Sequence, residues 1–288
     1  MPAIVAGKVC KVGRMYSRSN MMRKRIGVLG VLVGVGMGLS SHAGVAEAAL
    51  YETGFEAPDF TLGQNIHGIE GWSNTANHAT ATISDDAAAS GSQALKITST
   101  GGGSTDQINH DVASQAGQVL GQISVGMRLR IDTLTSSLDG RDMTLVIRGI
   151  DESTNTDADM VTISFKRSNS DTVANQIIVR NGFTDVSVGT WTAEQWMDLE
   201  ISLDTEADVF NLSINGDMAF GSEGADFRSN RSMADLTNVQ FRHTVWLTSS
   251  YFVDDYIVVP EPASLALLVL GGALCLRRNR KRTLPSQR

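Results

Sequence analysis

From Leu50 to Val259 the chain alternates short runs of apolar and polar residues with a period of two, as half-buried β-strands do. Glycine, serine, aspartate and asparagine separate these runs, and little of the region has helical periodicity. The pattern predicts strands over residues 94–98, 124–131, 143–148, 160–166, 176–180, 199–203 and 210–214. Many short strands in succession predict an all-β protein built as a β-sandwich or a barrel.

The polar segments between the predicted strands are expected to be turns and linkers. Asn215-Gly216 directly follows a predicted strand and is typical of a tight hairpin turn. Residues 151–159 are expected to form a solvated loop. This loop contains Asp151, Asp157 and Asp159, whose spacing lacks the glycine and the bidentate glutamate of an EF-hand calcium loop.

Charge divides the chain into an acidic body and two basic ends. Of the 24 Lys and Arg residues, 13 lie in 1–47 and 263–288, whereas 30 of the 31 acidic residues lie in 48–262. A body this acidic repels phosphate backbones, which argues against a nucleic-acid partner. Both cysteines, Cys10 and Cys275, lie in the ends, so the body has no disulfide, thiolate zinc site or cysteine nucleophile.

The N-terminal end, residues 1–48, has the features of an export signal preceded by an extension. Arg23-Lys24-Arg25 precedes an apolar run over 26–39, and Ala46-Glu47-Ala48 is a small-residue cleavage site. The alternative is a permanent membrane anchor, but the run is short for a bilayer about 30 Å thick. Export across the inner membrane is therefore expected.

The C-terminal end combines a proline-bounded junction, a short apolar stretch and a basic cluster. Pro260-Glu261-Pro262 precedes the apolar residues 263–276, which are marginal in length for a transmembrane helix. The basic cluster should stop transfer and leave residues 283–288 in the cytoplasm. It consists of Arg277, Arg278, Arg280, Lys281 and Arg282.

This tail, over residues 260–282, resembles the PEP-CTERM sorting signal in the order and position of its parts. The resemblance implies recognition by an exosortase, a membrane cysteine protease that processes near the Pro-Glu-Pro. It further implies a Gram-negative bacterium that makes exopolysaccharide. The protein is then anchored in the inner membrane before processing, and is at the cell surface or extracellular afterwards. An ordinary tail anchor with a chance Pro-Glu-Pro is the alternative.

The body, taken as one domain over 49–259, resembles the laminin-G/concanavalin-like jelly rolls of PEP-CTERM proteins and carbohydrate-binding modules. The segments that carry the resemblance are 51–56, 71–72, 189–191, 196–201, 210–216 and 251–257. In such folds the first and last strands pair. Trp191 and Trp196 are assigned to the core, with Trp196 adjoining the strand 199–203.

Glu56, Asp254 and Asp255 form the best candidate metal site. If the first and last strands are neighbours, these carboxylates and backbone carbonyls could bind calcium, which prefers hard oxygen ligands. Related jelly rolls often hold a structural calcium ion at this corner. The alternative is that Asp254 and Asp255 simply end a strand in an acidic surface. No other cofactor is expected.

Catalytic motifs are weak. Glu200 and Asp204 alternate along one strand, but Leu199, Ile201 and Leu203 fill its other face, so the two acids are interpreted as a solvent face and no catalytic residue is assigned. Trp72 and Trp246 are the candidates for sugar contact.

Three functions remain open. The leading hypothesis is a non-enzymatic surface protein that contacts extracellular polysaccharide or biofilm matrix. The alternatives are a polysaccharide hydrolase or lyase on the same fold and a purely structural matrix component.

Overall fold

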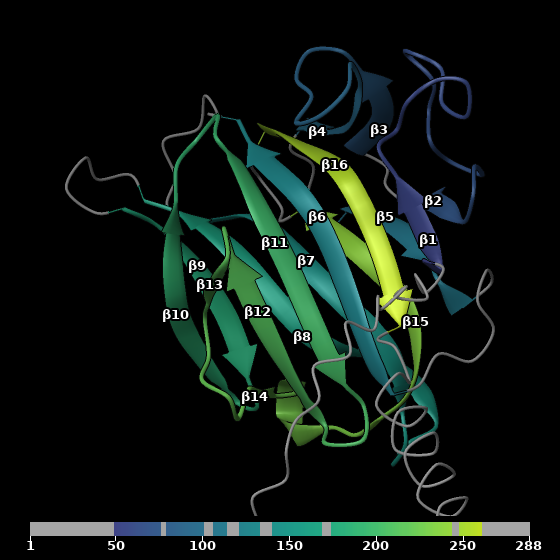
Figure 1. The fold of residues 1–288 in the computed structure, drawn as a ribbon. Coiled ribbons are helices and arrows are strands. Elements are labelled where there is room, and N and C mark those ends of the chain that lie inside the picture. Colours follow the sequence, from purple (N-terminus) through teal and green to yellow (C-terminus); the bar gives the residue numbers. More distant parts are fainter. Residues whose placement is uncertain are drawn as a thin grey trace, which may run out of the picture. The chain divides into compact units, whose positions relative to one another are not determined.

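The computed structural model describes residues 49–75, 79–100, 106–113, 121–132, 140–168, 174–243 and 248–260. These residues form two antiparallel sheets that pack face to face as a β-sandwich (Figure 1). The all-β prediction is confirmed. The N-terminal extension and signal, Trp246 and the tail from Glu261 onward lie outside the described residues.

Sheet A has the strand order β13-β12-β11-β6-β16-β4-β3, with β1 paired to β16 and β14 paired to β12. Its strands are β1 (Tyr51–Thr53), β3 (Ala79–Ser84), β4 (Ala94–Thr100), β6 (Gln122–Ile131), β11 (Trp196–Asp204), β12 (Val209–Ile214), β13 (Asp217–Met218), β14 (Ala225–Asp226) and β16 (Thr248–Pro260).

Sheet B has the strand order β10-β9-β8-β7-β15-β5-β2. Its strands are β2 (Trp72–Asn74), β5 (Asp106–Asp111), β7 (Gly140–Asp151), β8 (Thr156–Arg167), β9 (Asn175–Asn181), β10 (Thr184–Trp191) and β15 (Met233–His243). A short 3-10 helix, η1 (Arg228–Asn230), precedes β15.

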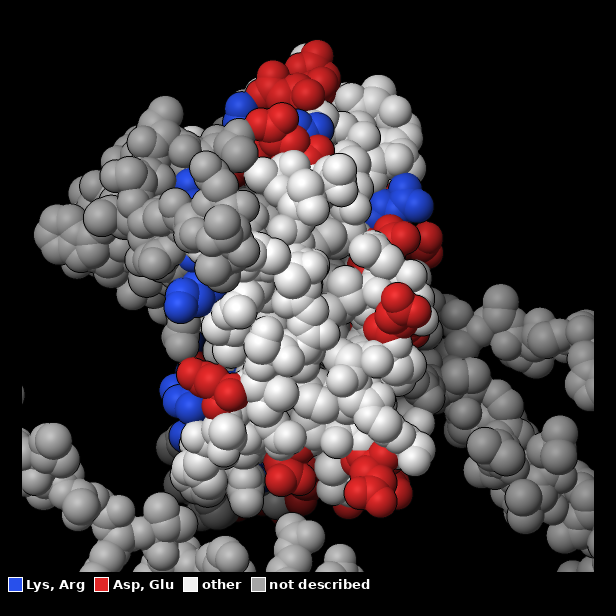
Figure 2. Space-filling model, turned by 90° about the vertical axis from the view of Figure 1, so that its left-hand side faces the viewer, with Lys and Arg blue, Asp and Glu red and all other residues white. Residues whose placement is uncertain are grey.

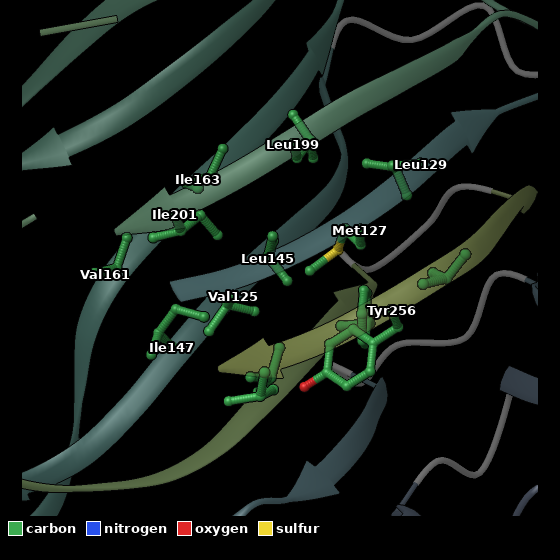
Figure 3. Close-up of a cluster of buried hydrophobic side chains, with 14 of the residues drawn as sticks. Val125, Met127, Leu129, Leu145, Ile147, Val161, Ile163, Leu199, Ile201 and Tyr256 are labelled. Carbon is green, nitrogen blue, oxygen red and sulfur yellow. The ribbon is translucent and has the colours of Figure 1, made fainter. Parts of the chain in front are cut away.

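The first and last strands pair as expected. Tyr51 of β1 lies opposite Val258 of β16, and Thr53 lies opposite Tyr256. Between the sheets, apolar side chains from β6, β7, β8, β11 and β16 interdigitate (Figure 3). Alternation explains this core: Leu199, Ile201 and Leu203 of β11 point inward and are buried, whereas Glu200 is exposed, as predicted.

Two local predictions are wrong. Residues 151–159 are not one loop, because β7 ends at Asp151 and β8 already begins at Thr156, which places Asp157 and Asp159 on a strand. Trp196 is only partly buried. It lies in the opposite alternation phase to Met197, and its ring is 6.5 Å from that of Phe252 in a small separate cluster. Trp191, at 4% exposed, is in the core as predicted.

Within the described residues, no helix is long and apolar enough to cross a membrane.

Candidate functional site

The three predicted calcium ligands meet around Gly54, just after β1. A Cβ atom at Gly54 would lie 3.8 Å from Asp255 Oδ1, 3.9 Å from Asp254 Oδ1 and 3.9 Å from Glu56 Cγ. The pairing of β1 with β16 causes this meeting, because it brings residues about two hundred positions apart to one corner of sheet A. The structure thus places the three acids around one glycine.

Asp254 is held by backbone N–H groups. Its Oδ2 atom accepts the N–H of Ala89 at 2.8 Å and of Ser90 at 3.0 Å, and its Oδ1 atom accepts the N–H of Asp255 at 2.8 Å. A bulge in β16 after Asp254, with Asp255 at φ 47°, turns the carboxylate toward the loop. Burial raises the pKa of Asp254, and these hydrogen bonds oppose that effect.

Glu56 binds the other end of the same loop, residues 85–93. Its Oε1 atom accepts the N–H of Ser92 at 2.7 Å and of Gln93 at 2.8 Å, and its Oε2 atom accepts the Ser92 hydroxyl at 2.8 Å. Desolvation acts to raise the pKa of Glu56, but the hydrogen bonds outweigh it and hold that pKa below its usual value. Gly91 has φ +60°, and a Cβ there would overlap Glu56 Oε1.

A calcium ion fits the chemistry of this corner only in part. Three carboxylates gather there, and Arg128 is the cation beside them, 3.5 Å from Asp255 Oδ2. However, the hydrogen bonds above already occupy oxygens of Asp254 and Glu56, and no group of three His, Cys, Asp or Glu side chains in the described ranges is arranged to hold a metal ion. Calcium at Glu56, Asp254 and Asp255 stays a prediction.

Trp72 is not the exposed sugar contact that the sequence suggested. It is 1% exposed, it donates Nε1–H to the hydroxyl of Tyr51 at 3.1 Å, and its ring packs near those of His110 and Phe241. Trp72 is buried because β2 pairs with β5, and this pairing turns the indole into the core between the sheets.

The outer face of sheet B carries a polar network that the sequence analysis missed. Asp159 of β8 is 16% exposed in its side chain, and it accepts two hydrogen bonds from Arg242, at 2.8 and 2.6 Å, and one from Arg228 at 2.8 Å. Arg148 lies 3.3 Å away. Burial of Asp159 opposes ionisation, but the hydrogen bonds and charge of Arg242, with the other arginines, hold its pKa below the usual value.

Basic residues are concentrated on this side of the sandwich. Of the 11 Lys and Arg residues in 48–262, eight lie on strands of sheet B or between β14 and β15: Arg141, Arg148, Lys166, Arg167, Arg180, Arg228, Arg231 and Arg242. On the β10 side of the molecule, Figure 2 shows acidic residues near both ends and uncharged residues over most of the middle. The arginines could have been noticed in the sequence, but not the aspartates they pair with.

Several polar atoms on this outer face are buried and have no hydrogen-bond partner among the described residues. They are Thr162 Oγ1, Asn109 Oδ1 and Asn238 Oδ1. Their neighbours along the strands, Ile163, Ile108 and Val239, point into the core, so these three side chains lie on the opposite face. Buried polar groups are normally hydrogen-bonded, so such atoms are sites where a polar ligand can be accepted.

Comparison with known proteins shows a fold and no family. No protein-family model matches the chain, and no curated protein matches it. Among solved structures, a sialidase superposes with a TM-score of 0.50 and 9% identity over 74% of this chain and 19% of the sialidase. The carbohydrate esterase vb_24B_21 from the Shiga toxin-encoding bacteriophage phi24B gives a TM-score of 0.50 and 14% identity over 73% of this chain and 99% of the esterase.

These likenesses define the class of the molecule as a jelly-roll β-sandwich, which agrees with the predicted fold. The chain spans about a fifth of the length of the sialidase. At such low identity the likeness carries the fold alone.

Proposed function

We propose that this protein is exported, sorted to the cell surface through its C-terminal tail, and contacts extracellular polysaccharide with its β-sandwich without catalysing a reaction. The observation that carries the polysaccharide contact is the polar outer face of sheet B. Hydroxyl, amide, guanidinium and carboxylate groups project there from a rigid sheet. Such groups match the many hydroxyls of a polysaccharide.

The ligand class also draws on the fold. The sialidase and the carbohydrate esterase that share the jelly roll are named for carbohydrate chemistry, which makes a glycan the first ligand class to test. The acidic balance of 48–262 argues against polyanions such as nucleic acid.

The pKa and the hydrogen bonds of the carboxylates on this face favour a binding role over hydrolysis. A glycosidase needs two carboxyl groups across the sugar, one of them with a raised pKa so that it can donate a proton. Asp159 has a lowered pKa and its oxygens are taken by Arg242 and Arg228. Asp157 is likewise engaged by Arg148 at 2.9 Å and by Thr237 at 2.7 Å.

The tail argument rests on the sequence. Pro260-Glu261-Pro262, the apolar residues 263–276 and the basic cluster from Arg277 to Arg282 support processing by an exosortase. Pro260, the first residue of the proposed sorting signal, is the last residue of strand β16.

The test is retention of full-length protein, purified in mild detergent, on a panel of immobilised polysaccharides, together with a reducing-sugar assay on the same polysaccharides. We expect retention on at least one polysaccharide and no release of reducing ends. Release of sugar would replace the binding role by a catalytic one. Absence of retention across the panel would leave a purely structural matrix component.

A further inference from the structure

A small polar hollow opens on the outer face of sheet B, at the end of the sheet where β8, β9 and β10 lie side by side. It has a volume of about 40 Å³ and is lined by Thr162, Ser164, Ile178, Arg180, Asp185 and Arg228. A cavity needs about 10–15 Å³ for each water-sized group, so about three such groups fit. The hollow can therefore take the hydroxyl-bearing edge of one sugar ring, and it is too small for a whole ring.

The groups around the hollow suit a hydroxyl better than a carboxylate. Two guanidinium groups, Arg180 and Arg228, offer donors, while the carboxylate of Asp185 offers an acceptor. A hydroxyl can accept from an arginine and donate to Asp185 at the same time. A ligand carboxylate only accepts, and it would be repelled by Asp185.

Thr162 supplies a further polar atom. Its hydroxyl oxygen is buried and has no hydrogen-bond partner among the described residues. Asp159, which binds Arg228 at 2.8 Å, holds that arginine beside the hollow. The hollow thus has a prearranged guanidinium and an unused hydroxyl, and a ligand hydroxyl would satisfy the latter.

An exposed aromatic residue is joined through its backbone to a residue that lines the hollow. Phe183 is 72% exposed, and its carbonyl accepts the Nη1–H of Arg180 at 2.9 Å. It stands in the hairpin between Arg180 and Asp185, which are themselves 3.2 Å apart as an ion pair. A flat apolar ring is a suitable surface for the apolar face of a sugar.

The hairpin that carries Phe183 is fixed to the segment that carries Arg228. Gly182 donates its N–H to Asp226 O at 3.2 Å, and Ser229 donates its N–H to Gly182 O at 2.7 Å. Gly182 has φ +53°, and a Cβ there would overlap Asn230 Oδ1, so the close approach depends on glycine. The backbone of the hairpin is therefore held in place relative to the segment that carries Arg228, which lowers the entropic cost of binding.

We propose that this hollow and Phe183 form one recognition subsite for a neutral, hydroxyl-rich polysaccharide, with one sugar lying on the phenyl ring and its hydroxyl edge entering the hollow. The proposal rests on the polysaccharide-binding function proposed above. It adds the residues that form the subsite, and it excludes uronic-acid polymers as the preferred ligand.

The test uses full-length protein in mild detergent and measures dissociation constants for a neutral β-glucan, a neutral xylan and the anionic polymer alginate. The variants are Phe183→Ala, which removes an exposed ring, and Thr162→Val, which removes the hydroxyl while keeping the side-chain shape. Met218→Ala is the matched control, because Met218 is an exposed apolar residue, at 58%, on β13 of the other sheet.

We expect a neutral polymer to bind more tightly than alginate, and each subsite variant to weaken that binding about tenfold, the effect of one lost contact. Met218→Ala should bind as the wild type does, and all three variants should keep the wild-type melting temperature within a few degrees.

If the wild type binds a neutral polymer and both subsite variants bind it equally well, the subsite is wrong and the polysaccharide function stands. Tighter binding of alginate overturns the choice of a neutral ligand. If the wild type binds none of the three polymers, the subsite proposal fails, and the wider panel above decides whether the function fails with it.

Discussion

The Nδ1 atom of His110 lies 3.1 Å from the hydroxyl oxygen of Tyr256, and this contact joins β5 of sheet B to β16 of sheet A through the core. Both residues are fully buried, and the rings of Tyr51 and Trp72 pack within 4.2 and 4.8 Å of the imidazole. A titratable ring at the centre of the sandwich couples the stability of the fold to pH.

Stability should fall as the pH drops from about 6.5 to 4. Burial lowers the pKa of His110 to about 4, whereas an unfolded histidine titrates near 6.5. Between these values the unfolded chain binds a proton that the folded chain does not, so unfolding becomes easier as the pH falls. The difference amounts to about 3 kcal/mol in the free energy of unfolding. Urea unfolding of the purified protein between pH 7.5 and 4 measures it.

One variant separates His110 from the carboxylates of the protein. His110→Phe should flatten the pH dependence, because it removes the buried imidazole and leaves the carboxylates in place. An unchanged pH dependence in His110→Phe would show that His110 does not cause it.

The two tryptophans that flank the β10–β11 connection should differ sharply in their effect on stability. Trp191 is in the core and donates Nε1–H to Lys166 O at 3.2 Å. Trp191→Ala should therefore cost about 3–5 kcal/mol in the free energy of unfolding. Trp196→Ala removes a partly exposed ring beside Phe252 and should cost about 1–2 kcal/mol. Equal losses, measured by chemical unfolding, would contradict the assignment of the two rings to different faces.

The strands were predictable from the sequence because alternation reports burial directly. All seven strands predicted from the pattern exist, with their ends extended by a few residues. The same alternation also predicts the orientation of Trp196. Met197 and Leu199 point into the core, so Trp196, one position before Met197, points to the outer face of the sheet. Position relative to the strand, and not residue type, decided which face Trp196 occupies.

The interactions that position the candidate sites could not be predicted in the same way. Asp157 and Asp159 look like loop residues because nothing nearby in the sequence balances their charge. Asp159 is tolerated on β8 because Arg242 arrives from β15 and Arg228 from η1, and Asp157 is tolerated because Arg148 of β7 pairs with it. Trp72 follows the same logic, since its burial depends on the pairing of β2 with β5. Long-range pairing, not local propensity, decided these positions.

Chelation should test the corner formed by Glu56, Asp254 and Asp255. If the corner binds calcium, a hundredfold excess of the ion over its dissociation constant stabilises the fold by about 2.7 kcal/mol, or about 5–10 °C in melting temperature for a domain of this size. We expect a chelator to remove this gain in the wild type. Thermal melts with calcium and with chelator measure it.

Asp254→Asn should abolish the response to calcium, whereas Asp198→Asn, at an exposed carboxylate of β11 bonded to Arg128, should keep it. Asp254→Asn should also melt lower under both conditions, because an amide cannot accept all three backbone N–H groups that Asp254 binds. A wild-type melting curve indifferent to chelator would remove calcium and leave Asp254 and Glu56 as hydrogen-bonding anchors of the loop 85–93.

Replacing Pro260 and Pro262 together by alanine should separate export from processing. The N-terminal signal is unchanged in this variant, so export should proceed, but the altered Pro-Glu-Pro should no longer be processed by an exosortase. The protein would then stay in the inner membrane with its basic end attached, because the cluster from Arg277 to Arg282 resists transfer. Cell fractionation, with mass spectrometry of the C-terminus, distinguishes the two forms.

Pro285→Ala changes a proline beyond the basic cluster and should be processed as the wild type is. Since Pro260 is the last residue of β16, opposite Ile123, the melting temperature of the double variant should be measured as well, so that a folding defect is not mistaken for failed processing. A stable double variant that is trimmed and released like the wild type would show that processing does not depend on the Pro-Glu-Pro, and the interpretation of residues 260–282 as a sorting signal would be wrong.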